Sequence, residues 1–382
     1  MDNLKTTIGE IFNELAGALE TGRVGSAIRV AVTILGSEHG PAEIIAGAQL
    51  AQKQNPDLEV CLIGPANDSG LTTYTTEDEA GQHHLMEQLL DSGEISACVT
   101  MHYNFPVGVA TVGRVITPGR GKEMILATTT GTAATDRVEA MIRNAVSGMA
   151  AAKAIGIAAP TIGILNVDGS RQVERSLNKL GENGYAFSWS SSVRADGGAV
   201  MRGNDLLLGA PDVMVTDTLT GNLLMKIFSA FNSGGDYEAL GYGYGPGIGP
   251  GYKRTILILS RASGAPVVAG ALKYAGELAK GKVLDKVAAE YSAAERAGMS
   301  TIFEEMRKAG AAATPQVVAP PKKVVTAEIT GVDVMQLEEA TQVLWSKGIY
   351  AETGMGCVGP VVLVAPEDEE QAAEELRKAG YF

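Results

Sequence analysis

Apolar runs of strand length alternate with stretches of helical periodicity along most of the chain. Because these runs show little alternation with polar residues, both faces of the strands are expected to be covered. The pattern predicts an α/β protein with a mostly parallel sheet and helices on both faces. The strand-loop-helix units lie at residues 28–52, 123–146, 161–184, 211–231 and 254–281.

The same pattern divides the chain into four segments. Residues 1–24 have the periodicity of an amphipathic helix, and residues 25–310 contain the sheet and end in a long helical stretch. Residues 311–323 are rich in alanine and proline without any period, so they are predicted to be a linker. Residues 324–382 read as strand, helix, hairpin and helix, a small β-α-β-β-α module of α+β class.

Composition and charge narrow the class of protein. A chain of 382 residues is expected to hold two or three domains, and 47 glycines with few aromatics suit many strand-to-helix turns. A net charge of −13 would repel a phosphate backbone, so nucleic acid is not expected as a partner. The start lacks the basic and apolar regions of a signal peptide, and no apolar run is long enough to span a bilayer. We therefore expect a cytoplasmic protein that does not bind membranes.

Three cysteines cannot all pair within one chain, and in a reducing compartment each is a thiol. Cys61 and Cys98 lie in apolar strand-like runs, which indicates core packing. Cys357 differs, because it lies among glycines in "TGMGCVGP", in the predicted hairpin of the C-terminal module. These glycines leave its sulfur open to approach, and the alternative is a turn with an incidental thiol.

Two loops stand at predicted carboxyl ends of strands, where ligands collect in doubly wound sheets. In "TDTLTGNLLMKI", residues Thr218, Thr220, Gly221 and Asn222 offer hydroxyl and amide donors and a close backbone approach at the start of a helix. Such a loop is suited to an anion, although Asn222 could equally cap the helix.

The second loop, "LSRASGAPVVAG", repeats the arrangement with a cation. Ser260 and Ser263 are hydroxyl donors, and the Arg261 guanidinium can hold two phosphate oxygens at once. Ser263 could also be a helix cap. Two such loops together favour a phosphate-binding site.

Other chemistries lack their usual motifs. The chain has no H-E-x-x-H, CxxC, P-loop or G-x-S-x-G, so no metal site, nucleotide site or serine nucleophile is predicted. His39 opens a predicted helix at a strand end, where capping or packing is favoured over a role in the cleft.

Several of these stretches resemble known families. "VAVTILGSEHGPAEIIAGAQLAQKQNPDLEVCLIG" and "PDVMVTDTLTGNLLMKI" resemble the phosphate acyltransferases of phospholipid synthesis, and "LSRAS" is similar to the active-site loop of phosphotransacetylases. The resemblance covers most of residues 25–310 and implies a two-lobed, isocitrate-dehydrogenase-like body. With the tethered "TGMGCVGP" added, the whole chain resembles the component C alpha subunits of the glycine, sarcosine and betaine reductase complexes of anaerobic, amino-acid-fermenting bacteria.

This resemblance implies a function. In those complexes a carboxymethyl group on a selenoprotein carrier, component A, becomes an acetyl thioester on component C and is transferred to phosphate as acetyl phosphate. Cys357 would carry the acetyl group, and the two loops would bind inorganic phosphate as co-substrate, with no cofactor required. The implied partners are the beta subunit of component C and the selenoprotein, in an oligomer. Two alternatives remain: a phosphate acyltransferase dependent on coenzyme A or acyl carrier protein, and a non-catalytic scaffold subunit.

Overall fold

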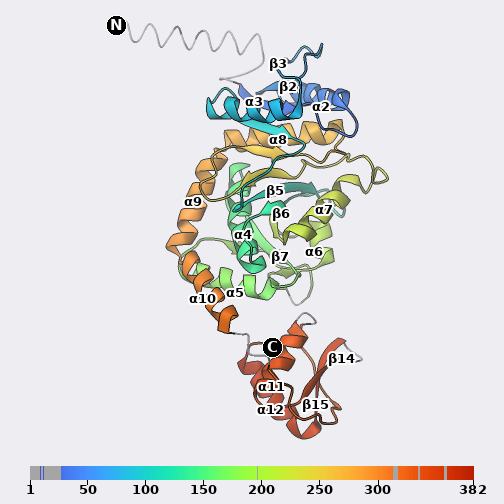
Figure 1. Cartoon of the computed structure of the whole chain (residues 1–382), viewed down its shortest axis with the longest axis vertical. Helices are drawn as coiled ribbons and strands as arrows, with labels where there is room; N and C mark the ends of the chain where they lie inside the picture. The colour runs from blue at the N-terminus through green and yellow to red at the C-terminus, as the bar shows by residue number, and fades with distance from the viewer. Residues whose placement is uncertain are drawn as a thin grey trace. The chain divides into compact units, whose positions relative to one another are not determined.

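The computed structural model describes residues 27–195, 197–312, 317–333, 336–356 and 359–382, together with positions 9 and 12. The predicted helix at residues 1–24 therefore lies outside the described residues, apart from those two positions. The chain forms two compact units, Met1–Ile302 and Phe303–Phe382, which are described separately below (Figure 1).

One large sheet forms the centre of the first unit. Its strands lie side by side in the order β3, β2, β1, β4, β12, β11, β5, β6, β10, β7 and β8, and β9 also pairs with β7. The strands are β1 (Ile28–Thr33), β2 (Leu58–Gly64), β3 (Thr72–Thr75), β4 (Ala97–Thr100), β5 (Val109–Ile116), β6 (Glu123–Thr132), β7 (Thr161–Leu165), β8 (Ser188–Trp189), β9 (Val200–Met201), β10 (Val213–Val215), β11 (Gly245–Ile248) and β12 (Ile256–Ile258).

The pairing directions divide this sheet into two lobes. β1 pairs in parallel with β2 and β4, and β12 continues the same direction beside β4. β10 is likewise parallel to β6 and β7. Between these two parallel groups, β11 is antiparallel to both β12 and β5, and β5 is antiparallel to β6. The predicted α/β class with a mostly parallel sheet is therefore confirmed.

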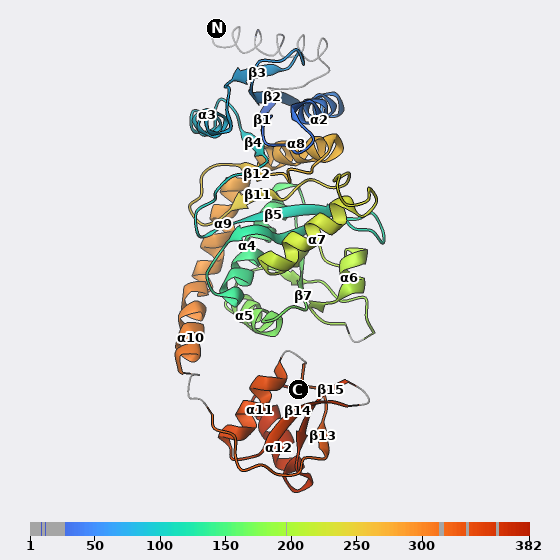
Figure 2. The ribbon, with the colours of Figure 1, turned by 45° about the vertical axis from the view of Figure 1, so that its right-hand side comes forward.

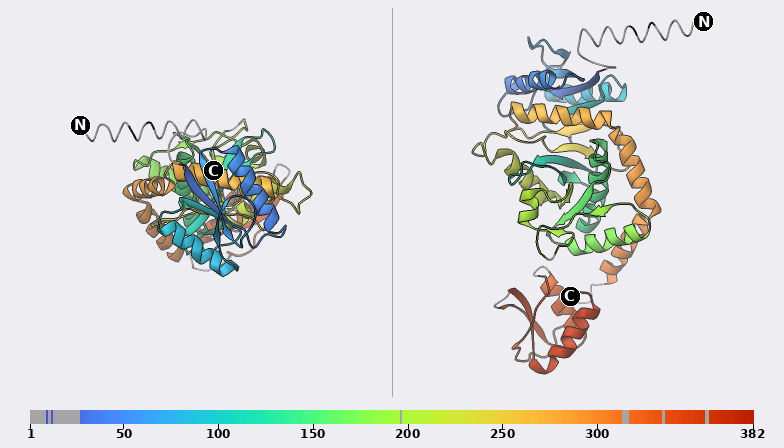
Figure 3. Two further views of the ribbon diagram at one scale, coloured as in Figure 1. Left: turned by 90° about the horizontal axis from the view of Figure 1, so that it is seen from above. Right: turned by 180° about the vertical axis from the view of Figure 1, so that it is seen from behind.

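Helices cover both faces of the sheet, as the uninterrupted apolar strands require. In the first lobe, α2 and α8 pack together, and Figure 2 shows α3 on the opposite side of the strands from α2. In the second lobe, α4 and α7 pack on β6, and α9 lies against α4 (Figure 3). The helices are α2 (Pro41–Gln54), α3 (Glu79–Asp91), α4 (Arg137–Ala154), α5 (Ser170–Glu182), α6 (Gly203–Leu208), α7 (Thr218–Ala230), α8 (Ala265–Lys280) and α9 (Val283–Arg296). The next helix, α10 (Met299–Ala312), begins in the first unit and continues into the second.

Each lobe has its own apolar cluster. The first contains Ile63, Met86 and both Cys61 and Cys98, whose side chains are fully buried. The second contains Leu126, Met214 and residues of α7. The prediction that Cys61 and Cys98 are core residues is confirmed, and burial raises the pKa of the Cys61 thiol to about 12.

The second unit is an α+β module. Its strands β13 (Ala327–Ile329), β14 (Ala351–Gly356) and β15 (Gly359–Val364) form an antiparallel sheet in the order β13, β15, β14. Helices α11 (Leu337–Ser346) and α12 (Glu369–Lys378) supply Leu344 and Leu376 to its core. Of the predicted linker, residues 311 and 312 belong instead to the end of α10, residues 317–323 contain neither helix nor strand, and 313–316 lie outside the described residues.

Within the part of the chain that the structure describes, no helix has the length and apolar character needed to cross a membrane.

Candidate functional site

The ends of β6 and β12, one from each lobe, meet at the start of β11. Thr129 near the end of β6 donates from its Oγ1 to the carbonyl of Tyr244 at 2.6 Å. The Tyr244 amide donates in turn to the carbonyl of Ile258, the last residue of β12, at 2.9 Å. The loops that follow the parallel strands of both lobes are therefore adjacent, which is where ligands bind in α/β sheets.

Helix α7 of the second lobe packs very closely against β6 at this junction. A Cβ on Gly221 would lie 1.7 Å from the carbonyl oxygen of Thr128, so only glycine allows this approach. The next residue, Asn222, donates from Nδ2 to the carbonyl of Thr129 at 3.1 Å. The side chain of Asn222 is thereby fixed at the strand ends by the packing of the helix on β6.

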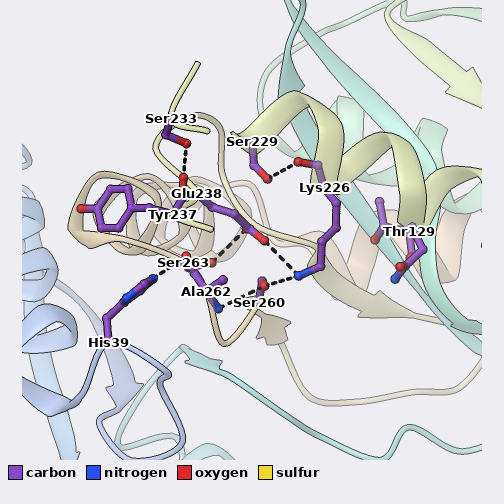
Figure 4. Close-up of polar contacts among 11 residues, drawn as sticks. His39, Thr129, Lys226, Ser229, Ser233, Tyr237, Glu238, Ser260, Ala262 and Ser263 are labelled. Carbon is purple, nitrogen blue, oxygen red and sulfur yellow. Dashed lines mark hydrogen bonds and ion pairs between the residues drawn. The ribbon is translucent and has the colours of Figure 1, made fainter. Parts of the chain in front are cut away.

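Lys226 connects the two lobes one turn farther along α7. Its Nζ lies 2.8 Å from Ser260 Oγ, in the loop after β12, and 3.3 Å from Oε1 of Glu238 (Figure 4). Glu238 is almost completely buried, with 2% of its surface exposed, while half of the Lys226 side chain remains accessible. The ammonium group thus has an internal counter-ion and an accessible side.

Glu238 organises the loop after β12. Its Oε2 accepts a hydrogen bond from Ser263 Oγ at 3.2 Å, and its main chain bonds with those of Ala262 and Gly264 at 2.9 Å each. A buried carboxylate with charged and hydroxyl partners is stable where an unpaired one would not be. The residue therefore holds the loop shape and the position of Lys226 together.

A second carboxylate joins this loop to α2. Glu43 accepts from Tyr237 Oη at 2.6 Å and from the amide of Ala265, the first residue of α8, at 2.8 Å. These two hydrogen bonds hold the pKa of Glu43 below its usual value. His39 contacts the same loop, with Nε2 3.2 Å from the Ala262 carbonyl and its ring 5.2 Å from that of Tyr237.

Burial also changes the titration of the tyrosine at the junction. The ring of Tyr244 lies in the core of the second lobe, and burial together with the charge of Glu238 raises the pKa of its hydroxyl. The hydroxyl therefore stays protonated at neutral pH.

The structure brings part of the predicted set together. Asn222 lies on α7 with Lys226, whose ammonium contacts Ser260. The Ser263 hydroxyl donates to Glu238, the carboxylate that also pairs with Lys226. Neither capping alternative is correct, because Asp217 caps α7 through the amides of Leu219 and Thr220, and Gly264 is the N-cap of α8.

Other predicted residues are placed differently. The hydroxyls of Thr218 and Thr220 donate to the Gly131 carbonyl at 3.2 Å and to Asp217 Oδ2 at 2.6 Å. Arg261 is exposed, and only its carbonyl, which accepts from the amide of Glu38, has a hydrogen bond among the described residues. Cys357 lies outside the described residues.

Sequence reasoning missed Lys226 and Glu238. Lys226 could have been found from the sequence, because it follows Asn222 by four residues and must lie on the same face of the helix. Glu238 lies in an irregular, glycine-rich stretch, and its contacts could not be inferred locally. Among the described residues, no group of three or more metal-binding side chains is found.

Comparison with known proteins identifies the family of the chain. The model of the family described as fatty acid synthesis protein matches residues 28–363. The glycine/sarcosine/betaine reductase complex component C subunit alpha of Peptoclostridium acidaminophilum is 56% identical over 382 residues, covering 100% of this chain and 99% of that protein. The phosphate acyltransferase of Anoxybacillus flavithermus (strain DSM 21510 / WK1) is 28% identical over 239 residues, covering 52% of this chain and 70% of that protein.

Among solved structures, a branched-chain phosphotransacylase from Enterococcus faecalis V583 aligns with a TM-score of 0.46 and 16% identity, over 66% of this chain and 99% of that one. The family match and the full-length relative are the decisive findings. The chain belongs to the fatty acid synthesis protein family, and over its whole length it is similar to the alpha subunit of reductase component C.

Proposed function

We propose that this chain transfers an acetyl group from an enzyme thioester to inorganic phosphate, forming acetyl phosphate as a subunit of a glycine, sarcosine or betaine reductase complex. The observation that carries the proposal is the position of Lys226 between the two loops that sequence analysis selected for phosphate. The full-length relative from Peptoclostridium acidaminophilum supports the complex, and the phosphate acyltransferase relatives support the reaction class.

Donor capacity at this point suits an anion. An ammonium group has three donors, and two of those on Lys226 are directed to Glu238 and Ser260. Ser260 Oγ accepts from Lys226 and from the amide of Ala262 at 3.3 Å, and no acceptor for its own proton is found among the described residues. The Asn222 amide uses one of its two hydrogens on Thr129. Lys226 and Ser260 each keep a donor for phosphate or for a developing oxyanion. The Asn222 side chain also interacts with the Tyr244 hydroxyl, so its second donor would be shared between Tyr244 and the ligand.

The proposed reaction is a substitution at the acetyl carbon. A phosphate oxygen attacks the thioester carbonyl on Cys357, and the carbonyl oxygen becomes an oxyanion that Ser260 and Asn222 stabilise. When the intermediate collapses, the bond between carbon and sulfur breaks, its electron pair stays on the sulfur, and acetyl phosphate is released. Lys226 would neutralise charge on phosphate, and Arg261 would add a second cation from the exposed side of the loop.

The proposal includes the other members of the system. The chain would work in the cytoplasm with the beta subunit of component C and would receive its acetyl group from the selenoprotein carrier, component A. It would need no cofactor besides phosphate as co-substrate. The tethered module would let Cys357 reach both the donor and the phosphate site.

Arsenate-dependent breakdown of acetyl phosphate provides the deciding assay, because the acetyl arsenate formed in it hydrolyses and the acetyl transfer therefore cannot run back. The purified chain should break down acetyl phosphate in an arsenate-dependent manner without coenzyme A. Activity only with coenzyme A or acyl carrier protein would point to the alternative acyltransferase. If the chain together with the beta subunit shows no activity without additions, with coenzyme A or with acyl carrier protein, the scaffold role would remain.

Labelling tests the position of the thioester. Radiolabelled acetyl phosphate should leave a hydroxylamine-sensitive acetyl group on the peptide that contains Cys357, and Cys357→Ser should lose both label and turnover. Cys61 and Cys98 provide internal controls, since both are fully buried and should stay unlabelled. Label on either of them, or full turnover by Cys357→Ser, would contradict the assignment.

A further inference from the structure

The C-terminal module has an open groove between helix α11 and the edge of its sheet. The volume of this groove is about 670 Å³, which is within the range of sites that bind ligands. Leu337, Thr341 and Trp345, at intervals of four residues, line it from α11. Ala351 and Thr353 line it from β14, the last strand on that side of the sheet. The α11–β14 groove therefore lies where a further strand would extend the sheet.

The main chain of β14 offers hydrogen-bonding groups along this edge. The Val364 carbonyl accepts from the Thr326 amide, so Val364 directs its main-chain groups away from Ala351, its neighbour in β14. In an antiparallel pair such residues alternate with hydrogen-bonded ones, so Ala351 and Thr353 direct their own groups to the open edge. The Ala351 carbonyl accepts from Trp345 Nε1 at 2.9 Å. The amide and carbonyl of Thr353 have no hydrogen-bond partner among the described residues, so a new strand could pair there.

The usual protection of a sheet edge is missing from β14. Natural sheets protect their edges with charged side chains, proline, bulges or a covering segment. The only charged residue of β14 is Glu352, which pairs with Lys322 at 3.2 Å, and the strand contains no proline. Its register with β15 runs without a shift from Ala351 to Gly356. An open edge of this kind is where proteins bind an extended segment of a partner.

Charge indicates which kind of segment fits. Residues 324–382 contain eleven acidic and three basic side chains, so this part carries a net charge of −8 out of the −13 of the whole chain. Glu338 lines the α11–β14 groove, is exposed, and has no ion-pair partner among the described residues. A second copy of the module, or an acidic segment, would be repelled. A segment that carries lysine or arginine would be attracted.

We propose that the α11–β14 groove binds an extended basic segment of a partner protein, which adds a strand to the edge of β14. Main-chain hydrogen bonds to Thr353 would supply affinity, and a cation of the segment would pair with Glu338. Cys357 follows β14 directly in the sequence, so the partner would bind close to the proposed acetyl carrier along the chain. That last consequence rests on the proposed function, whereas the binding itself does not.

Selection from a peptide library tests this proposal. The probe is a library of random eight-residue peptides, first depleted on the Thr353→Pro chain and then selected on the full-length wild-type chain. The proline removes the amide at the open edge, which the pairing with β15 does not use. The selected peptides should be rich in lysine and arginine and should bind the Thr353→Pro chain about 10-fold more weakly or worse in fluorescence anisotropy. Thr353→Val keeps the amide and is the matched control, so it should bind as wild type does.

Two further measurements do not depend on whether the proline variant folds. Glu338→Lys should weaken binding of the same peptides by about 10-fold at low salt, and the difference should shrink as salt is added. Peptides that are N-methylated at alternate residues keep their charge but lose one row of main-chain donors. One of the two alternate N-methylated forms should therefore fail to bind, because only one row faces β14.

The outcomes that contradict the proposal are distinct from a failure of acetyl transfer, since none of these measurements uses the arsenate assay. A selection that yields no peptide, or peptides without basic residues, would overturn the proposal. Binding that is unaffected by both Glu338→Lys and N-methylation would overturn it too. A lower mass of the Thr353→Pro chain in sedimentation equilibrium would show that a second copy occupies the edge, which is likewise incompatible with a basic partner segment.

Discussion

Substitution of Lys226 by methionine tests the candidate site most directly, because it removes the cation and keeps the length of the side chain. The stability cost follows from the environment of Glu238, which is 2% exposed and lies 3.3 Å from Lys226 Nζ. Breaking a fully buried ion pair costs about 3–5 kcal/mol, and breaking an exposed one costs about 0–1 kcal/mol. Lys226 is half exposed and Ser263 still donates to Glu238, so the free energy of unfolding should fall by about 1–2 kcal/mol.

The effect on chemistry should be larger than the effect on stability. Removal of one preorganised donor from a site of developing charge typically costs about 2.7–4 kcal/mol in the transition state. Lys226→Met should therefore lower kcat/KM for arsenate-dependent breakdown of acetyl phosphate by about 100-fold or more, while the protein remains folded.

A second substitution separates the two effects. Glu238→Gln in the Lys226→Met chain removes the uncompensated carboxylate, so most of the lost stability should return in urea unfolding, but activity should not. Arg261→Ala is the matched comparison, because its exposed side chain should leave stability unchanged while phosphate use weakens. Wild-type turnover by Lys226→Met, or recovery of turnover in the double variant, would show that Lys226 only supports the fold.

Three further predictions test the surroundings of the site. Gly221→Ala should destabilise the first unit by about 3 kcal/mol or more in urea unfolding, since the alanine Cβ would lie 1.7 Å from the Thr128 carbonyl oxygen. The hydrogen bond from Tyr237 lowers the pKa of Glu43, so the charged carboxylate of Glu43 stabilises the fold above about pH 4.3. This contribution is lost as the pH falls through the lowered pKa. The advantage of wild type over Glu43→Gln in free energy of unfolding should therefore be larger at pH 7 than at pH 4. Limited proteolysis should cut first within residues 311–323, and first cleavage elsewhere would contradict the linker.

Local signals explain why much of the fold could be predicted. Apolar runs and helical periods are properties of neighbouring residues, so the strand-loop-helix units around β10 and β12 were visible in the sequence. Strand order is different, because it depends on contacts between distant segments. The placement of antiparallel β11 between β12 and β5, which joins the lobes, left no local pattern.

The candidate site likewise combines features that have a local sequence signal with features that arise only from tertiary contacts. Both loops could be predicted, since each follows a strand and precedes a helix. The helix cap was assigned to Asn222 as an alternative, yet Asp217 lies nearer the helix start and caps α7 instead. Glu238 became a site residue only through tertiary contacts with Lys226 and Ser263, which are 12 and 25 residues away in the chain.

Helix α7 shows how these levels of structure depend on one another. Gly221 on its inner face permits contact with β6, and that contact sets the height at which Asn222 and Lys226 reach the strand ends. Leu223 and Ile227 are exposed on its outer face, and contiguous apolar surface of this kind indicates an interaction site. In a helix of 13 residues, the requirements of core, site and surface leave room for a single charged side chain, and that one bridges the lobes. A change on any face should therefore be felt at the other two, because all three share one rigid backbone.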